Sequence, residues 1–259
     1  GVTALVVSKF LADAAARHPN KTALVASDHR YTFAELHSAV LCLARWLTAS
    51  GLNRGDRVAI NLGNSYETVV SILGTLAAGG CFVIINPTIK EDKIVHLLAH
   101  SGARFLITEQ SRQALLEDCC SRVPSPPVMM YTGKSAPAAK SFDDIISLQS
   151  DTVVSDPIDM DPAAIIYTSG STGEPKGVTL THRNIVSATN SIAQYMENRP
   201  DDVILNLLPL SHGYGLCQLF VSMLVGCTLV LEKGFGYPYQ IIKRIKDEKI
   251  EVGHKKRCG

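Results

Sequence analysis

The sequence predicts an α/β fold, in which two related β-α-β halves form mostly parallel sheets covered by helices. Short continuous apolar runs, typical of strands buried on both faces, alternate with longer segments of helical character. In addition, residues 57–62 (RVAINL) resemble residues 202–207 (DVILNL) at an offset of 145 positions, which is 202 minus 57. Each of these segments continues into an apolar helix-like run and then a short strand, so we expect a duplicated β-α-β plan.

The expected elements follow from hydrophobic periodicity, taken in chain order. Thr32 before Phe33, with Glu35 three residues later, is a capping-box pattern that marks the start of a helix. The predicted helices are 9–17, 33–50, 66–78, 91–101, 183–196 and 239–248. The predicted strands are 23–26, 58–62, 81–85, 105–108, 164–168, 203–207 and 227–231.

Length and composition allow a large core, since the chain has 259 residues of which 46% are hydrophobic. Residues 123–159 are rich in proline, serine and aspartate, and we interpret them as a surface connector with short ordered pieces at 128–131 and 142–145. The connector separates the two halves, about 1–122 and 160–259.

Charge and hydropathy exclude several kinds of partner. The net charge is +1 and only 19% of residues are charged, so we expect no nucleic acid partner. Two long uncharged stretches, 68–89 and 203–231, are interrupted by glycine pairs, proline and polar residues. A membrane-spanning helix needs about 20 mostly apolar residues in unbroken register, so we expect no membrane span.

The cysteines indicate reduced thiols. Their number is odd, they include a vicinal pair, and they show neither CxxC spacing nor a Cys/His ligand pattern. We therefore expect a cytoplasmic protein without a disulfide framework or a zinc site. The seven positions are Cys42, Cys81, Cys119, Cys120, Cys217, Cys227 and Cys258.

The segment 167–178 (YTSGSTGEPKGV) directly follows the predicted strand 164–168 and carries the strongest chemical signal. Its first two glycines permit the dihedrals that let backbone N–H groups converge on a polyphosphate, and its hydroxyls and lysine add donors and charge. A lysine followed by Gly177 does not fit the Walker A pattern. A flexible linker is the alternative, but a linker does not usually lie between a buried strand and a second alternating segment that leads into a helix.

This segment, followed by residues 181–184 (THRN), resembles the signature of the adenylate-forming (AMP-binding) ligase superfamily, which includes acyl-CoA synthetases, adenylation domains of peptide synthetases and luciferases. The resemblance covers nearly the whole chain up to about residue 251. It implies the large domain of the adenylate-forming ligase fold. Further matching segments are 31–36 (YTFAEL), 55–58 (GDRV), 76–80 (LAAGG), 86–87 (NP) and 208–213 (LPLSHG).

The resemblance implies a reaction in which a carboxylate attacks the α-phosphate of Mg-ATP, pyrophosphate leaves, and a thiol captures the acyl adenylate. The expected substrates and cofactors are a carboxylic acid, ATP, Mg²⁺ and coenzyme A or a carrier-protein thiol. Residues 208–216 resemble acyl-CoA or fatty-acyl ligases more than amino-acid-activating domains. The residues implied in holding the β- and γ-phosphates are Thr168, Ser169, Gly170, Ser171, Thr172, Gly173 and Lys176.

Two further roles are implied by the resemblance alone. Thr172 is expected near the magnesium ion, and His212 is expected at the mouth of the carboxylate pocket. A hydrogen-bonded core histidine is the alternative for His212. His182 is expected to help start a helix rather than to perform acid–base chemistry.

The chain departs from the family at its end, where residues 251–259 lack the next expected strand. The adenine-binding strand, the magnesium-binding Glu, the ribose-binding Asp and the C-terminal domain with the catalytic Lys are not in this sequence. We therefore expect an incomplete large domain that adenylates weakly or not at all by itself. The alternative is a non-catalytic nucleotide-binding or interaction protein that associates through an exposed sheet edge.

Overall fold

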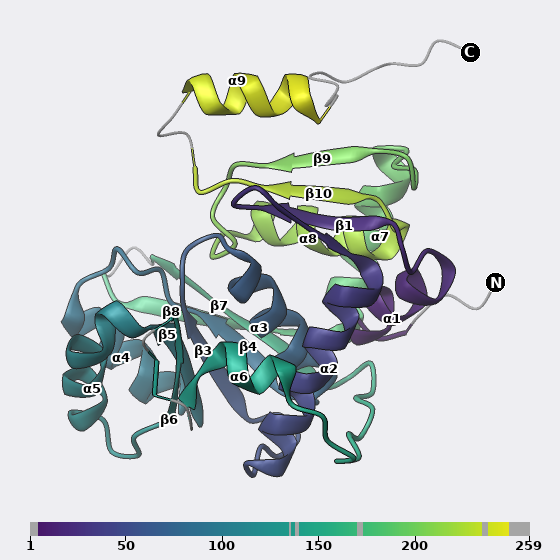
Figure 1. Cartoon of the computed structure of the whole chain (residues 1–259). Helices are drawn as coiled ribbons and strands as arrows, with labels where there is room; N and C mark the ends of the chain where they lie inside the picture. The colour runs from purple at the N-terminus through teal and green to yellow at the C-terminus, as the bar shows by residue number, and fades with distance from the viewer. Residues whose placement is uncertain (1–4, 135, 138–139, 170–172, 235–237, 249–259) are drawn as a thin grey trace.

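The computed structural model describes residues 5–134, 136–137, 140–169, 173–234 and 238–248, which form two sheets (Figure 1). The sheets have the strand orders β2-β1-β10-β9 and β6-β5-β3-β4-β7-β8. The strands are β1 (Thr22–Ala26), β2 (His29–Thr32), β3 (Arg57–Asn61), β4 (Cys81–Ile84), β5 (Phe105–Glu109), β6 (Val128–Thr132), β7 (Pro162–Ser169), β8 (Pro175–Thr181), β9 (Val203–Asn206) and β10 (Thr228–Leu231).

Both sheets are mostly parallel, as the sequence predicts. Within the four-stranded sheet β1, β10 and β9 are parallel, and within the six-stranded sheet β6, β5, β3, β4 and β7 are parallel. One edge strand of each sheet, β2 or β8, is antiparallel. Each sheet takes strands from both sides of the connector, so the sheets are closed by contacts between distant parts of the chain.

Helices cover the sheets in layers (Figure 1). α1, α2, α3, α7 and α8 lie between the two sheets, α4 and α5 lie on the outer face of the six-stranded sheet, and α9 lies beyond the four-stranded sheet. The helices are α1 (Ser8–Arg17), α2 (Phe33–Ala49), α3 (Tyr66–Ala77), α4 (Glu91–Ser101), α5 (Gln113–Ser121), α6 (Phe142–Ser147), α7 (His182–Tyr195), α8 (Gly213–Val225) and α9 (Pro238–Asp247), with the 3-10 helix η1 (Gln110–Arg112).

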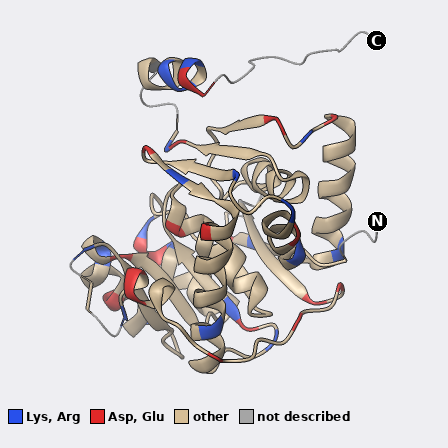
Figure 2. Ribbon diagram, turned by 45° about the vertical axis from the view of Figure 1, so that its right-hand side comes forward, with Lys and Arg blue, Asp and Glu red and all other residues tan. Residues whose placement is uncertain are grey.

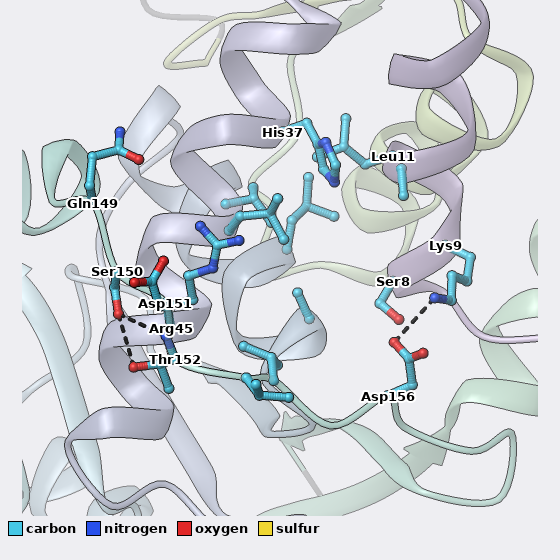
Figure 3. Close-up of a pocket in the computed structure, with 17 residues that line it drawn as sticks. Ser8, Lys9, Leu11, His37, Arg45, Gln149, Ser150, Asp151, Thr152 and Asp156 are labelled. Carbon is cyan, nitrogen blue, oxygen red and sulfur yellow. Dashed lines mark hydrogen bonds and ion pairs between the residues drawn. The ribbon is translucent and has the colours of Figure 1, made fainter.

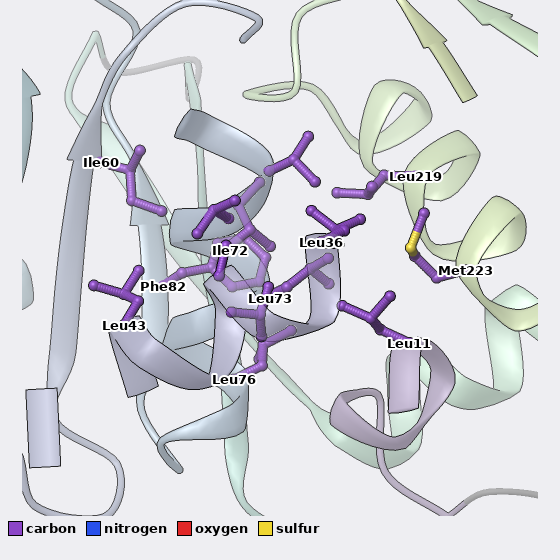
Figure 4. Close-up of a cluster of buried hydrophobic side chains, with 14 of the residues drawn as sticks. Leu11, Leu36, Leu43, Ile60, Ile72, Leu73, Leu76, Phe82, Leu219 and Met223 are labelled. Atoms are coloured by element: carbon purple, nitrogen blue, oxygen red, sulfur yellow. The ribbon is translucent and has the colours of Figure 1, made fainter. Parts of the chain in front are cut away.

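The core sits on both faces of the six-stranded sheet because successive strand side chains point to opposite faces. Val58 and Ile60 of β3 face the layer between the sheets, whereas Ala59 faces α4 and α5. The inner layer joins side chains from distant segments, such as Leu36, Phe82 and Leu219 (Figure 4). This shared layer makes the two sheets parts of one hydrophobic core.

The sequence missed the β1–β2 hairpin. Ser27 and Asp28 form its two-residue turn, with φ of 48° and 64°. Both values are left-handed, as a tight hairpin turn of this kind requires at its two central residues. Asn-Gly and Asp-Gly are the usual signals for this turn, and Ser-Asp does not carry them. The polar strand after the turn, with His29 and Arg30 exposed, also lacks an apolar run.

The connector contains the two short ordered pieces that the sequence predicts. β6 extends the parallel sheet beside β5, and α6 packs Phe142 and Ile145 into the inner core. The expectation of a surface connector is therefore wrong for these two pieces, because most of their apolar side chains are buried. The helix α5 was not predicted, since it is short and buries only Leu116, Cys119 and Cys120. The other predicted elements are confirmed within two residues at each end.

Two further expectations from the sequence concern membrane-spanning helices and the state of the cysteines. Across the described ranges, no helix is both long and apolar enough to cross a membrane. The cysteines from Cys42 to Cys227 are free thiols, and Cys258 lies outside the described residues. Lys and Arg are interspersed with Asp and Glu over the ribbon (Figure 2), in agreement with the low net charge.

Candidate functional site

The glycine-rich segment connects β7 and β8, which pair as an antiparallel hairpin. β7 lies parallel to β4 with Ala164 opposite Phe82, so residues after Ile166 extend past Ile84, the last residue of β4. The segment therefore begins at the carboxyl edge of the parallel strands. Ligands of open α/β sheets bind at this edge.

The hairpin brings two predicted phosphate-binding residues together. Thr168 is the cross-strand partner of Lys176, and both side chains are exposed. Gly173 has φ of 78°, a left-handed value that glycine adopts without strain. Ser169 ends β7 opposite Pro175. The predicted residues Gly170, Ser171 and Thr172, including the predicted magnesium neighbour, lie outside the described residues.

His212 lies next to the four-stranded sheet, in the turn between β9 and α8. It is the N-cap residue of α8, its side chain makes no capping hydrogen bond, and it is exposed. This exposure is contrary to the alternative that His212 is a core histidine. The side chain is accessible to a ligand at the start of α8, where backbone N–H groups lack intrahelical partners.

Asn64 fixes this turn, and the sequence analysis did not identify it. Its side-chain Nδ2 donates to the carbonyl oxygens of Leu208 at 2.9 Å and Glu232 at 3.0 Å, and its Oδ1 accepts from the Leu210 N–H at 2.9 Å. Asn64 follows the carboxyl end of β3, so one amide joins the ends of β3, β9 and β10. Its only sequence signal is a polar residue placed just after a buried strand.

His182 has a structural position at the start of α7. Thr181 caps the helix in a capping box with Asn184, while the buried imidazole Nδ1 of His182 accepts from the Val7 N–H at 3.1 Å. Burial lowers the pKa of His182 to about 4, and nearby Asp161 opposes this shift. A histidine that stays neutral and bonded to the backbone holds the N-terminal segment against α7.

Asp161 completes a small polar network at the start of β7. Arg54 Nε donates to its carboxylate at 2.7 Å, and the Ile158 N–H donates at 2.9 Å. Burial raises the pKa of Asp161, but the hydrogen bonds from Arg54 and Ile158 outweigh it, so the pKa lies below its ordinary value. The network anchors the amino end of the strand that carries the glycine-rich segment.

A cavity of about 720 Å³ lies away from the hairpin, between α1, α2, α3 and residues 149–156 (Figure 3). Polar side chains such as His37 and Arg45 line it together with apolar ones such as Leu11. None of the described residues of the glycine-rich segment lines this cavity. The part of the chain that the structure describes also has no cluster of His, Cys, Asp or Glu that could hold a metal ion.

Comparison with known proteins gives one consistent family. Residues 11–254 match the family described as AMP-binding enzyme. The chain is 30% identical to a long-chain-fatty-acid–CoA ligase of Bacillus subtilis (strain 168), with 94% of this chain and 49% of that protein covered. It is 31% identical to bacitracin synthase 1 of Bacillus licheniformis, with 92% of this chain and 4% of that protein covered.

The fold agrees with solved structures of the same kind. The structure of apo MatB from Rhodopseudomonas palustris superposes with a TM-score of 0.83 at 26% identity, over 93% of this chain and 47% of that chain. The chain thus spans about half the length of this protein and of the Bacillus subtilis ligase. Its sequence match, its parallel sheets and its glycine-rich hairpin agree, and the chain belongs to the AMP-binding enzyme family.

Proposed function

We propose that this chain binds the triphosphate of ATP through residues 168–176, in a protein that activates a carboxylic acid as an acyl adenylate. The observation that carries the proposal is the hairpin, in which Thr168 lies opposite Lys176 at the carboxyl edge of the parallel sheet. The activated acyl group then passes to the thiol of coenzyme A or of a carrier protein. The relatives named as CoA ligases support this acceptor.

In this reaction a carboxylate oxygen of the acid attacks the α-phosphorus, and the bond from that phosphorus to the bridging oxygen breaks. Pyrophosphate leaves with the electron pair of that bond. The contribution of the chain is to neutralise and align the β- and γ-phosphates, because fixed donors cost no reorganisation during the reaction. Lys176 supplies the positive charge, and Mg²⁺ enters as part of the Mg-ATP substrate, with Thr172 near it.

The proposed role of His212 is to contact the carboxylate of the acid. Its exposed side chain and the free N–H groups at the start of α8 are donors that favour a negatively charged group. The ligase from Bacillus subtilis supports a fatty acid as the substrate class. A structure of VinN in complex with L-aspartate is similar at 26% identity over 95% of this chain, so amino acids are the competing class.

The phosphate role is tested by calorimetric titration of the chain with magnesium pyrophosphate and Mg-ATP. Lys176→Ala should weaken binding by about 10- to 100-fold, the range expected for a lost hydrogen bond to a charged group. Lys176→Arg should retain part of the affinity, since the charge remains. Lys93→Ala, which removes an exposed lysine on α4, is the matched control and should bind as the wild type does. Unchanged binding by Lys176→Ala would refute the phosphate role.

A non-catalytic interaction protein is the second candidate, and the position of β9 favours it. β9 is the last strand of its sheet among the described residues, and Val203, Ile204 and Leu205 are only partly buried. Edge strands with apolar side chains promote pairing with another chain. Light scattering should then show a concentration-dependent dimer that Ile204→Lys abolishes. A monomer at all concentrations would count against it.

A further inference from the structure

Tyr167 lies immediately before Thr168, and its side chain contacts a helix instead of the ligand edge. The ring packs on the outer face of the six-stranded sheet, in the cluster formed with α4 and α5. Its hydroxyl lies 2.7 Å from Nδ1 of His100, in the last turn of α4, and either group can donate. The two rings meet edge to face, with centroids 5.6 Å apart and planes at 77°.

The same ring also covers the neighbouring strand of the hairpin. Gly177 is the cross-strand partner of Tyr167, and a Cβ added to Gly177 would lie 3.1 Å from Cε1 and 3.3 Å from Cζ of the tyrosine. Because glycine has no side chain, the ring can rest directly on the β8 backbone. Tyr167 therefore contacts β7, β8 and α4 at once.

Tyr167 contacts α4 at the point where the pairing of β7 with β4 ends. Residues of β7 beyond Ile166 extend past the end of β4, so within the described sheet they pair only with β8. The hairpin base is held at the other end by Asp161 and Arg54. Among the described residues, the hydrogen bond between Tyr167 and His100 thus links α4 to the strand end that carries Thr168.

The neighbours of the pair keep the phenol neutral. Burial raises the pKa of Tyr167, with Cys81 adding to the shift and Arg57 opposing it. His96 stacks on His100 from one turn earlier in α4, with ring centroids 5.9 Å apart. The phenol therefore keeps its proton and can take part in the hydrogen bond with His100.

We propose that Tyr167 and His100 are positioning residues, which hold the paired residues Thr168 and Lys176 in the orientation that binds phosphate. The inference rests on the proposed function of residues 168–176. In this role neither side chain contacts the phosphates itself, because the Tyr167 ring packs against α4 on the outer face of the six-stranded sheet. Their effect is preorganisation: a hairpin end that is already fixed loses less conformational freedom when the ligand binds.

The test is calorimetric titration of the full chain with magnesium pyrophosphate and Mg-ATP. Tyr167→Phe keeps the ring on Gly177 but removes the hydroxyl, and His100→Leu removes its partner. Each should weaken binding by about three- to tenfold, the range for one neutral hydrogen bond. His100→Asn should restore most of the affinity, because its amide can take the place of Nδ1. Lys93→Ala, an exposed position on the same helix, is the matched control and should leave binding unchanged.

The double variant, Tyr167→Phe with His100→Leu, separates positioning from a general loss of stability. If the two residues act as one unit, the double variant should bind no more weakly than either single variant. Additive losses, or wild-type binding by both single variants, would overturn the positioning role. If those variants and Lys176→Ala all bind as the wild type does, or if the wild type binds neither ligand, the phosphate-binding proposal itself fails.

Discussion

The β3-α3-β4 unit and the β9-α8-β10 unit share a sequence pattern but occupy different surroundings. β3 and β4 are central strands of the six-stranded sheet, and α3 begins with a Ser65 cap and is buried along most of its length. β9 is an edge strand of the four-stranded sheet as far as the structure describes the chain, and α8 begins after His212, whose side chain makes no cap. The first unit is therefore an enclosed scaffold, whereas the second exposes a polar side chain, that of His212, at its carboxyl edge.

The paired asparagines at the strand ends show the same contrast. Asn61 Nδ2 donates to the Ile85 carbonyl at 2.9 Å, and its Oδ1 lies 3.3 Å from Thr108 Oγ1. Asn206 Nδ2 donates to the Gly215 carbonyl at 3.0 Å, but its buried Oδ1 has no partner among the described residues. Among the described residues, both polar side-chain atoms of Asn61 thus have a partner, whereas only one of the two has a partner in Asn206.

The largest difference in the free energy of unfolding is expected between substitutions in β4 and in β9. Phe82→Ala removes a fully buried ring from β4 and should lower the free energy of unfolding by about 3–5 kcal/mol. Ile204→Ala in β9 should cost about 1–2 kcal/mol, because part of that side chain is already in contact with water. Urea denaturation of the two variants measures both. Equal losses would contradict the assignment of the first unit as scaffold.

His182, at the start of α7, should make the stability of the chain depend on pH. The pKa of His182 is about 4 in the folded chain, below its ordinary value of 6.5, so the unfolded chain takes up the proton first as pH falls. Its stabilising effect is complete above about pH 6.5 and should decline by roughly 3 kcal/mol towards pH 4. Urea denaturation at several pH values checks this.

The test variant is His182→Asn. It should flatten the decline between pH 6.5 and 4, because asparagine does not titrate, while its amide oxygen can still accept from the Val7 N–H. An unchanged slope in His182→Asn would show that another group causes the decline.

Substitution of Asn61 and of Asn206 should give a smaller difference in the free energy of unfolding. Asn61→Ala leaves the Ile85 carbonyl and Thr108 without this partner and should lower the free energy of unfolding by about 2–3 kcal/mol. Asn206→Ala should cost about 1 kcal/mol, because only one of its two polar atoms is bonded. Thermal and urea denaturation together give the two values, and a larger loss for Asn206→Ala would reverse the comparison.

The smallest effect concerns the helix caps. Ser65→Ala removes the oxygen that accepts from the Thr68 N–H and should cost about 1 kcal/mol. His212→Ala should change the free energy of unfolding by less than about 0.5 kcal/mol, since His212 makes no side-chain cap. A loss as large for His212→Ala would show that its side chain supports α8.

Local pattern was enough to predict most elements. The capping box of Thr32 and Glu35 is present, with the Glu35 N–H donating to Thr32 Oγ1 at 3.1 Å. Buried strands such as β3 and β5 are continuous apolar runs, so their signal is independent of their neighbours. β2 and α5 were missed because a polar edge strand and a short helix with few buried residues have weak periodicity.

The candidate site was only partly predictable. Lys176 and Gly173 belong to one short segment and could be named from it, whereas Asn64 and Leu208 are 144 residues apart and meet only in the folded chain. The same holds for His100 and Tyr167, which are 67 residues apart. No local pattern specifies which distant group will satisfy a given donor or acceptor.

The sequence by itself determined most of the strands and helices, the glycine-rich segment and the family, because each depends on residues that are close together in the chain. Tertiary structure decided which β-α-β unit is enclosed and which is open, since burial depends on the strands that flank each unit. It also decided that Tyr167 meets His100 and that His212 is exposed while His182 is buried. These outcomes depend on packing between distant segments, which periodicity does not encode.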